Sequence, residues 1–238
     1  MSTVVDLLTA TTQHWGLALT ATQVEQFDTY RQELQQWNTQ LNLTTVIDDQ
    51  GIVVRHFLDS LSCALYWGPT PPTTLADIGS GAGFPGLALA ILAPHTHVTL
   101  VESIEKKAAF LRHMIERLQL AHVRVVVARA EEIGRDPQHR EQYQVVTARA
   151  LAELRILVEY CLPLCLVGGV LIAPKGPQAA AEAQAATNAL SHTGGQLAQI
   201  HAVHLPGEPE RAMVVISKTQ PTPLRYPRAI GIPSKRPL

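Results

Sequence analysis

The most informative stretch of the chain is DIGSGAGFPG, residues 77–86, which carries Gly79, Gly81, Gly83 and Gly86. A short apolar run that predicts a β-strand precedes it, and a helix-like segment follows it. Glycines permit a tight turn and let backbone N–H groups approach a ligand at the positive N-terminus of a helix. The spacing Gly81-x-Gly83-x-x-Gly86 also satisfies the dinucleotide pattern GxGxxG, so nicotinamide and flavin enzymes are candidates at this point.

Around this turn, short apolar runs alternate with helix-like segments over residues 71–217. Such alternation is typical of an α/β domain in which helices cover both faces of a parallel sheet. We predict seven strands and four helices for this part of the chain. The strands are 74–78, 97–101, 123–127, 144–147, 170–173, 197–204 and 212–218, and the helices are 86–92, 106–118, 153–162 and 178–190.

Two further segments flank this domain. Residues 1–70 are predicted to form a helical extension, because apolar residues recur at steps of three and four from Val24 to Leu41 and a second helical pattern covers 52–65. Thr22 and Glu25 fit a capping box at the start of the first of these helices. Residues 218–238 hold five prolines and no periodicity, which predicts an ordered or partly ordered surface tail.

The composition excludes several classes of protein. With 238 residues, of which 46% are hydrophobic and 16% charged, the chain is neither disordered nor a polyelectrolyte. Three cysteines without a CxxC pair favour a reducing compartment and argue against disulfides and zinc, so we predict no metal. The N-terminus lacks the features of a secretory signal, and no apolar run reaches about 18 residues. We therefore expect a cytoplasmic monomer that does not contact membranes.

Two carboxylates shift the balance from dinucleotides to S-adenosylmethionine (SAM). Asp77 stands two residues before Gly79 at the end of the first strand; SAM carries a positive sulfonium and no pyrophosphate, so this carboxylate does not repel it. Glu102 ends the second strand 23 residues after Gly79, where it can accept hydrogen bonds from ribose hydroxyls. The residues alone therefore predict a cofactor site that contains Asp77, Gly79, Gly81, Gly83 and Glu102.

Seven motifs spread over nearly the whole chain point to one family. They are WNTQLNLT (37–44), VVRHFLDSL (53–61), GSGAGFPG (79–86), VESIEKKAAFLR (101–112), ARAEE (128–132), TARA (147–150) and YPR…PSKRPL (226–238). Together they resemble the RsmG (GidB) family of 16S rRNA guanine-N7 methyltransferases. The resemblance implies a class I SAM-dependent methyltransferase: a Rossmann-like, seven-stranded, mostly parallel sheet with helices on both faces, preceded by a helical extension.

The resemblance also implies the reaction and part of its site. SAM is the methyl donor, S-adenosylhomocysteine (SAH) is the product, and the acceptor is N7 of one guanine in the helix-18 loop of 16S rRNA, near the decoding centre. The partner is then 16S rRNA or the small ribosomal subunit. The family's SAM contacts fall on Gly79, Phe84, Ala130, Glu131 and Arg149. Because guanine N7 has a free lone pair and no proton to lose, we expect catalysis by positioning, without a general base.

Two basic residues are the predicted catalytic residues. Arg149 and Lys175 follow the fourth and fifth strands, at the edge where doubly wound sheets bind ligands. We predict that they face the guanine, its flanking phosphates or the SAM carboxylate, with Arg129 as a third basic contact. For His56, which stands near Asp59 on a predicted helix, we expect a packed, hydrogen-bonded role rather than that of a base.

Three alternatives stay open from the residues. A class I methyltransferase for another RNA or a small molecule shares the glycine turn, although a small-molecule enzyme is expected to have an aromatic lid and no basic tail. A nicotinamide enzyme predicts a second mononucleotide-binding half after Lys175, where the pattern gives one helix and two strands. A noncatalytic RNA-binding protein is expected to lose the glycines or Glu102, and both are present.

The net charge of −1 is an average over three unlike segments. Residues 1–70 carry 2 basic and 7 acidic residues, residues 71–217 carry 12 and 13, and residues 218–238 carry 5 and 0. Attraction to phosphate depends on local rather than summed charge. We expect the basic tail 218–238 to contact RNA, and its deletion to weaken RNA binding while SAM affinity stays nearly unchanged.

Overall fold

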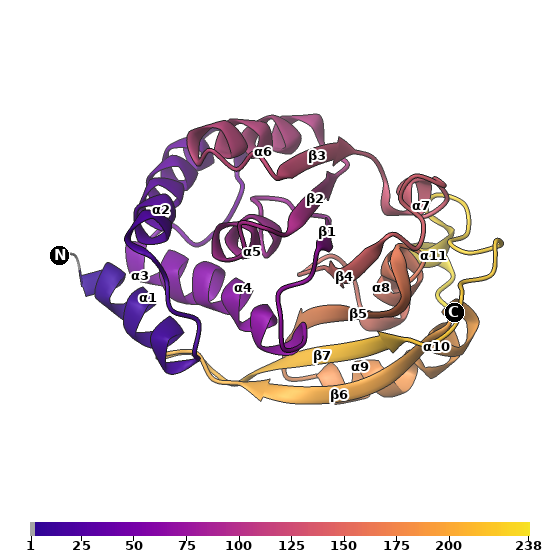
Figure 1. Cartoon of the computed structure of the whole chain (residues 1–238). Helices are drawn as coiled ribbons and strands as arrows, with labels where there is room; N and C mark the ends of the chain where they lie inside the picture. Colours follow the sequence, from indigo (N-terminus) through magenta and orange to yellow (C-terminus); the bar gives the residue numbers. More distant parts are fainter. Residues whose placement is uncertain (1–2) are drawn as a thin grey trace.

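A seven-stranded sheet forms the centre of the molecule (Figure 1). The computed structural model describes residues 3–238, so residues 1 and 2 of the predicted extension lie outside the described part. The strand order is β3-β2-β1-β4-β5-β7-β6. β1 to β5 run parallel, and β7 runs antiparallel to both β5 and β6, which confirms the predicted mostly parallel sheet. The strands are β1 (Thr74–Ile78), β2 (His97–Glu102), β3 (Val123–Val127), β4 (Tyr143–Thr147), β5 (Cys165–Lys175), β6 (Gly195–Val203) and β7 (Arg211–Lys218).

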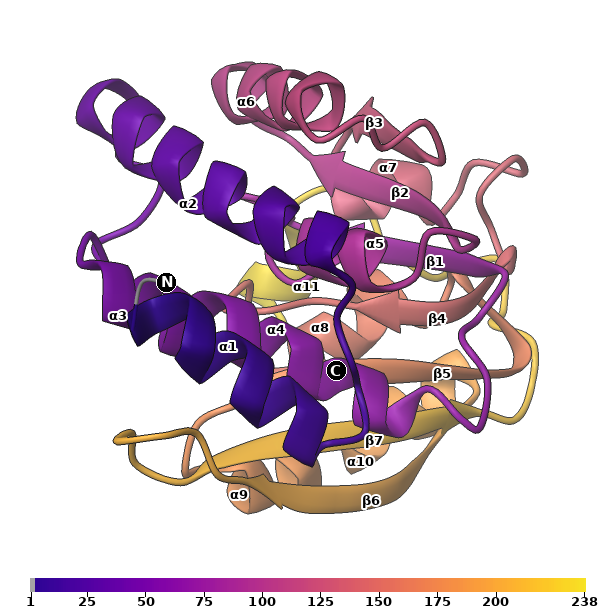
Figure 2. The same ribbon diagram turned by 60° about the vertical axis from the view of Figure 1, so that its left-hand side comes forward.

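Helices cover both faces of the sheet (Figure 2). Successive residues of a strand point to opposite faces, so Leu75 packs into one core and Ala76 into the other. The first core is closed by α1 (Thr3–His14), α2 (Ala21–Leu41), α5 (Gly86–Leu92) and α6 (Glu105–Arg117), and the second by α8 (Leu154–Cys161), α9 (Ala179–Ala185) and α10 (Thr187–Thr193).

The N-terminal extension shares its core with the sheet. Phe27 and Tyr30 of α2 are buried in one cluster with Phe57, with Leu87 of α5 and with Leu100 of β2. Between α2 and β1 the chain forms α3 (Asp49–Gly51), a π-helix (Ile52–Leu58), α4 (Asp59–Leu61) and a 3-10 helix (Ser62–Tyr66). π-helical turns are frequent at functional sites. The extension therefore packs directly against the elements that carry the glycine turn.

The structure corrects the predicted start of α2. The capping box is formed by Thr20 and Gln23: Thr20 Oγ1 accepts the N–H of Gln23 (3.2 Å), and Gln23 Oε1 accepts the N–H of Thr20 (2.9 Å). Thr20 has the extended backbone that an N-cap requires, whereas the predicted Thr22 already lies inside the helix. The predicted helix 178–190 is also two helices, α9 and α10.

Candidate active site

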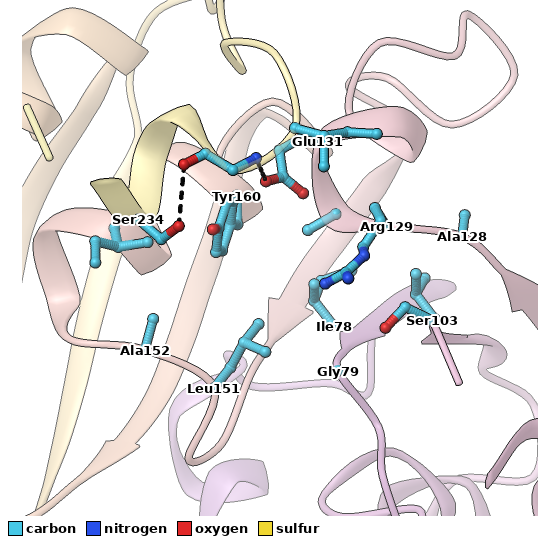
Figure 3. A pocket seen from close by; sticks show the side chains of 15 residues that line it. Ile78, Gly79, Ser103, Ala128, Arg129, Glu131, Leu151, Ala152, Tyr160 and Ser234 are labelled. Atoms are coloured by element: carbon cyan, nitrogen blue, oxygen red, sulfur yellow. Dashed lines mark hydrogen bonds between the residues drawn. The ribbon is translucent and has the colours of Figure 1, made fainter. Parts of the chain in front are cut away.

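A cavity of about 420 Å³ opens at the carboxyl edge of the parallel strands (Figure 3). Four regions supply its walls: the ends of β1 and β2, the segment from the end of β3 into α7 (Ala130–Ile133), the loop after β4 with α8, and residues 230–234. A volume of this size suits a small organic ligand. The lining residues are Ile78, Gly79, Val101, Ser103, Ala128, Arg129, Ala130, Glu131, Leu151, Ala152, Ile156, Tyr160, Ile230, Gly231 and Ser234.

The glycine turn brings the backbone to the wall of this cavity. Gly79 has a φ of +72°, in the left-handed region that favours glycine. A Cβ at this position would lie 2.8 Å from Cδ1 of Leu151, which also lines the cavity. The absence of a side chain at Gly79 therefore lets the loop after β4 close over the end of β1. Gly81 and Gly83 also have positive φ, but they shape the turn without lining the cavity.

Asp77 supports the turn from beneath. Its side chain is fully buried; Oδ2 accepts the N–H of Gly86 (3.0 Å), and Oδ1 accepts the hydroxyl of Thr147 (3.3 Å). Burial raises the pKa of Asp77 to about 6, against the opposing effect of these hydrogen bonds. Asp77 does not line the cavity. In this structure it joins the end of β1 to α5 and β4.

The two glutamates predicted at the site differ in position. Glu102 Oε2 accepts the N–H of Gly81 (2.9 Å) and Oε1 accepts that of Ile104 (2.8 Å), so this carboxylate ties the glycine turn to the end of β2. Each carboxylate oxygen can accept a second hydrogen bond. Glu131 lines the cavity itself, and its Oε1 accepts the N–H of Gly231 (2.9 Å).

Phe84 and Arg149 lie together under the N-terminal extension. The ring of Phe84 stacks on Tyr30 (5.1 Å between centroids) and on His56 (4.6 Å), and the Arg149 guanidinium lies 5.1 Å from its centre. Nη1 of Arg149 donates to Oδ2 of Asp59 (2.8 Å), a carboxylate with 2% exposure. Neither Phe84 nor Arg149 lines the cavity.

His56 occupies the packed position expected of it. Its Nε2 lies 2.7 Å from the hydroxyl of Thr44, and its Nδ1 lies 3.2 Å from Nη2 of Arg149. Burial, and then the positive charge of Arg149, lower the pKa of His56 to about 3. The imidazole is therefore neutral at neutral pH and joins the extension to the loop after β4.

Lys175 holds the loop after β4 through a hydrogen bond and an ion pair. Its Nζ donates to the carbonyl of Ala152 (2.7 Å) and to Oε2 of Glu182 (2.7 Å). The same Glu182 oxygen accepts the N–H of Leu154 (2.8 Å). Because Ala152 lines the cavity and Lys175 does not, Lys175 acts on the cavity through the backbone of this loop. A direct contact of Arg149 or Lys175 with a substrate stays a prediction.

The tail is less available to RNA than its sequence implied. Lys218 ends β7 in the core, where its Nζ donates to the carbonyls of Leu162 and Thr193. Arg228 pairs with the buried Glu159 at 2.6 Å. Two of the five cations thus hold the tail to the domain. The tail also supplies wall residues to the cavity, so the expectation that its deletion leaves SAM affinity nearly unchanged depends on whether SAM binds there.

Most of the residues that line the cavity were missed by the sequence reasoning. They are Ile78, Val101, Ser103, Ala128, Leu151, Ala152, Ile156, Tyr160, Ile230, Gly231 and Ser234. The signal available for the tail was its motif, YPR…PSKRPL, which spans the last three of these residues. Of the predicted residues, Gly79, Arg129, Ala130 and Glu131 meet at the cavity.

The donor set of the cavity fits an adenosine-type ligand such as SAM. Its walls are largely apolar, as a flat ring requires, and they offer the Glu131 carboxylate and the Ser103 hydroxyl to polar groups. Burial raises the pKa of the Tyr160 phenol, which stays protonated at neutral pH and can donate. Within residues 3–238, no group of three or more His, Cys, Asp or Glu side chains is arranged to hold a metal ion. No helix in the same range is long and apolar enough to cross a membrane.

Comparison with known proteins gives consistent matches. The family model described as "rRNA small subunit methyltransferase G" (GidB) matches residues 23–214. A protein named ribosomal RNA small subunit methyltransferase G from Roseiflexus sp. (strain RS-1) is 57% identical, covering 98% of this chain and 100% of the relative. The protein of the same name from Chloroflexus aggregans is 53% identical, covering 98% and 97%.

Solved structures resemble the sheet and its helices. A predicted O-methyltransferase from Agrobacterium tumefaciens superposes with a TM-score of 0.54 at 25% identity, covering 68% of this chain and 81% of that one. M. jannaschii TYW2 in complex with AdoMet superposes with a TM-score of 0.53 at 14% identity, covering 68% and 74%. These likenesses confirm the class I methyltransferase fold.

Proposed function

The chain belongs to the rRNA small subunit methyltransferase G family, and from this we propose that it methylates N7 of a single guanine in the helix-18 loop of 16S rRNA. At the coarser level the chain is a SAM-dependent methyltransferase of small-subunit rRNA. We further assign SAM to the cavity beside Gly79, and we expect the protein to act as a cytoplasmic monomer.

The choice of a guanine N7 acceptor comes from the family resemblance, and one observation supports it. Among the described residues that line the cavity, Glu131 is the only carboxylate; its Oε1 accepts a hydrogen bond from the backbone of Gly231, and we assign its Oε2 to SAM rather than to the acceptor. His56, the histidine packed on the glycine turn, is engaged with Thr44 and Arg149. A site of this kind suits an acceptor that loses no proton, and guanine N7 has a free lone pair.

The mechanism follows from positioning. When bound, SAM would supply an electrophilic methyl group, and its transfer to N7 with loss of the C–S bond would leave neutral SAH and a positively charged 7-methylguanine. Holding two reactants in line can lower the activation free energy by up to about 7 to 11 kcal/mol. The close approach of Leu151 to Gly79 positions the loop after β4 against the end of β1. Lys175 holds the same loop through its hydrogen bond to the carbonyl of Ala152.

Charge pairing suits a product that gains positive charge. Arg149 is paired with Asp59, and Lys175 with Glu182, so neither is an isolated cation near the acceptor. Arg129 lines the cavity and is exposed. Lys235, the last residue of α11 (Ile232–Lys235), and Arg236 directly after it are also exposed. We assign these three exposed cations to the RNA phosphates. Lys218 and Arg228, the two tail cations that are paired within the domain, are left out of this assignment.

The test is methyl transfer to small subunits from a strain that lacks this gene. Purified protein and SAM with a labelled methyl group are incubated with the subunits, and 7-methylguanine is mapped by chemical cleavage of the 16S rRNA. We expect one labelled position, in the helix-18 loop. Label at another RNA position or in a small molecule would refute the proposal. Ser103→Trp, which places an indole on the cavity wall, is the control for the cofactor assignment, because it should abolish transfer without unfolding the protein.

A further inference from the structure

We propose that residues 226–236, here called the C-terminal strap, form a wall of the SAM cavity and set the affinity for the cofactor. Ile230, Gly231 and Ser234 of the strap line the cavity. Figure 3 shows Ser234 on the side away from Gly79. The proposal rests on the assignment of SAM to this cavity. It gives the tail a binding role that is separate from any contact with RNA.

The strap is fixed to α8 by an ion pair whose carboxylate is buried. Glu159 of α8 has a side-chain exposure of 0%. Its Oε1 accepts the backbone N–H of Arg228 (2.8 Å) and Nε–H (2.9 Å), and its Oε2 accepts an N–H from Nη2 (2.6 Å). A buried carboxylate requires such partners, so the start of the strap has one defined position.

Two arginines hold the strap from the other side. Nε of Arg135 donates to the carbonyl of Pro227 (2.8 Å). Arg140 donates from Nη1 to the carbonyl of Tyr226 (2.9 Å) and from Nη2 to that of Thr222 (2.6 Å). Both arginines follow α7, which begins at the cavity. The strap therefore spans the space between α7 and α8, two helices that both supply residues to the cavity wall.

At the cavity the strap contacts a predicted cofactor residue. The N–H of Gly231 donates to Oε1 of Glu131 (2.9 Å), and Oγ of Ser234 donates to the carbonyl of Gly231 (3.1 Å), as the dashed lines in Figure 3 mark. Glu131 is 6% exposed, so this bond fixes the carboxylate and leaves Oε2 available to a ligand. The donors that SAM offers to such an oxygen are its amino groups and its ribose hydroxyls.

Gly231 has a backbone conformation that makes this contact specific. Its φ is +77°, and a Cβ there would meet no atom within 4 Å. Glycine is thus favoured here by the positive φ of the turn, and not by a lack of space for a side chain. The turn directs the N–H toward Glu131, and Lys235 of α11 and Arg236 directly after it are both exposed.

The experiment measures SAH binding by isothermal titration calorimetry, without RNA. Deletion of residues 231–238 keeps the pair between Arg228 and Glu159 but removes Gly231 and Ser234 from the wall. Gly231→Pro keeps the full chain, but it removes the N–H and cannot adopt the positive φ. We expect either change to weaken SAH binding at least tenfold. Thermal melting monitored by circular dichroism establishes that the variants are folded.

Matched variants separate the possible outcomes. Gly207→Pro makes the same change at a glycine with φ +73° in the β6–β7 turn, and Lys235→Ala with Arg236→Ala removes the cations but keeps the wall; both should bind SAH within twofold of the wild type. A folded deletion or Gly231→Pro protein with wild-type SAH affinity would overturn the strap proposal. If Ser103→Trp also leaves SAH affinity unchanged, the assignment of SAM to this cavity fails with it.

Discussion

Replacing Arg228 with methionine tests whether the ion pair with Glu159 anchors the strap. Methionine keeps much of the apolar stem of the side chain but removes the Nε and Nη2 donors, so the buried Glu159 carboxylate retains only the backbone N–H of residue 228. Removing one partner of a buried pair costs about 3–5 kcal/mol. Because 25% of the Arg228 side chain is exposed and one donor remains, we expect the lower end, about 3 kcal/mol.

The assay is equilibrium unfolding in urea, with thermal melting alongside. In a protein of this size each kcal/mol shifts Tm by about 2–4 °C, so Arg228→Met should lower Tm by about 6–12 °C. The double variant Glu159→Leu with Arg228→Met removes both charges and should regain most of the loss. Arg225→Met, at an exposed arginine over the ring of Tyr226, is the control and should cost less than about 1 kcal/mol. The anchoring role is refuted if Arg228→Met costs no more than this control, or if the double variant is no more stable than the single one.

Three further predictions concern the turn and the loop after β4. Burial raises the pKa of Asp77 to about 6, above its unfolded value of about 3.9. The contribution of this carboxyl group to stability is therefore fully present below pH 4 and is lost as pH rises through 6. Asp77→Asn should remove this part of the pH dependence of the unfolding free energy, and an unchanged profile would contradict the prediction. Tyr30→Phe removes the bond from its hydroxyl to the Ala82 carbonyl (2.6 Å) and should cost about 1 kcal/mol in urea unfolding; no loss would show that the bond does not hold the turn. Lys175→Met should lower the rate of methyl transfer at least tenfold with SAH affinity reduced less than threefold, and wild-type transfer would remove Lys175 from the site.

The sheet was predictable because buried parallel strands have a simple pattern. β1 and β2 are mostly apolar, buried runs that end in a carboxylate or just after one, and the glycine turn separates β1 from its helix. The start of α2 was not predictable to the residue. Thr20-x-x-Gln23 and Thr22-x-x-Glu25 both satisfy the capping-box pattern, and only the backbone conformation of Thr20 decides between them.

The sequence located part of the cavity lining, but it did not reveal the contacts between distant segments. Gly79 and Glu131 stand in motifs whose local sequence is informative, and they line the cavity. Asp77 and Glu102 stand in equally suggestive positions, but they accept backbone N–H groups of the turn, because one residue type serves both to bind a ligand and to support a loop. The pairing of Arg228 with Glu159 joins positions 69 residues apart, and no local pattern records it.

The strap also makes the cavity wall depend on segments that lie far apart in the chain. The glycine turn follows the first strand of the sheet, whereas Ile230, Gly231 and Ser234 come after the last one. Under the proposed assignment of SAM to this cavity, cofactor affinity therefore depends on the docking of the tail as well as on the folding of the sheet. A loss of affinity can then arise from a substitution at Arg228 or Glu159, neither of which lines the cavity.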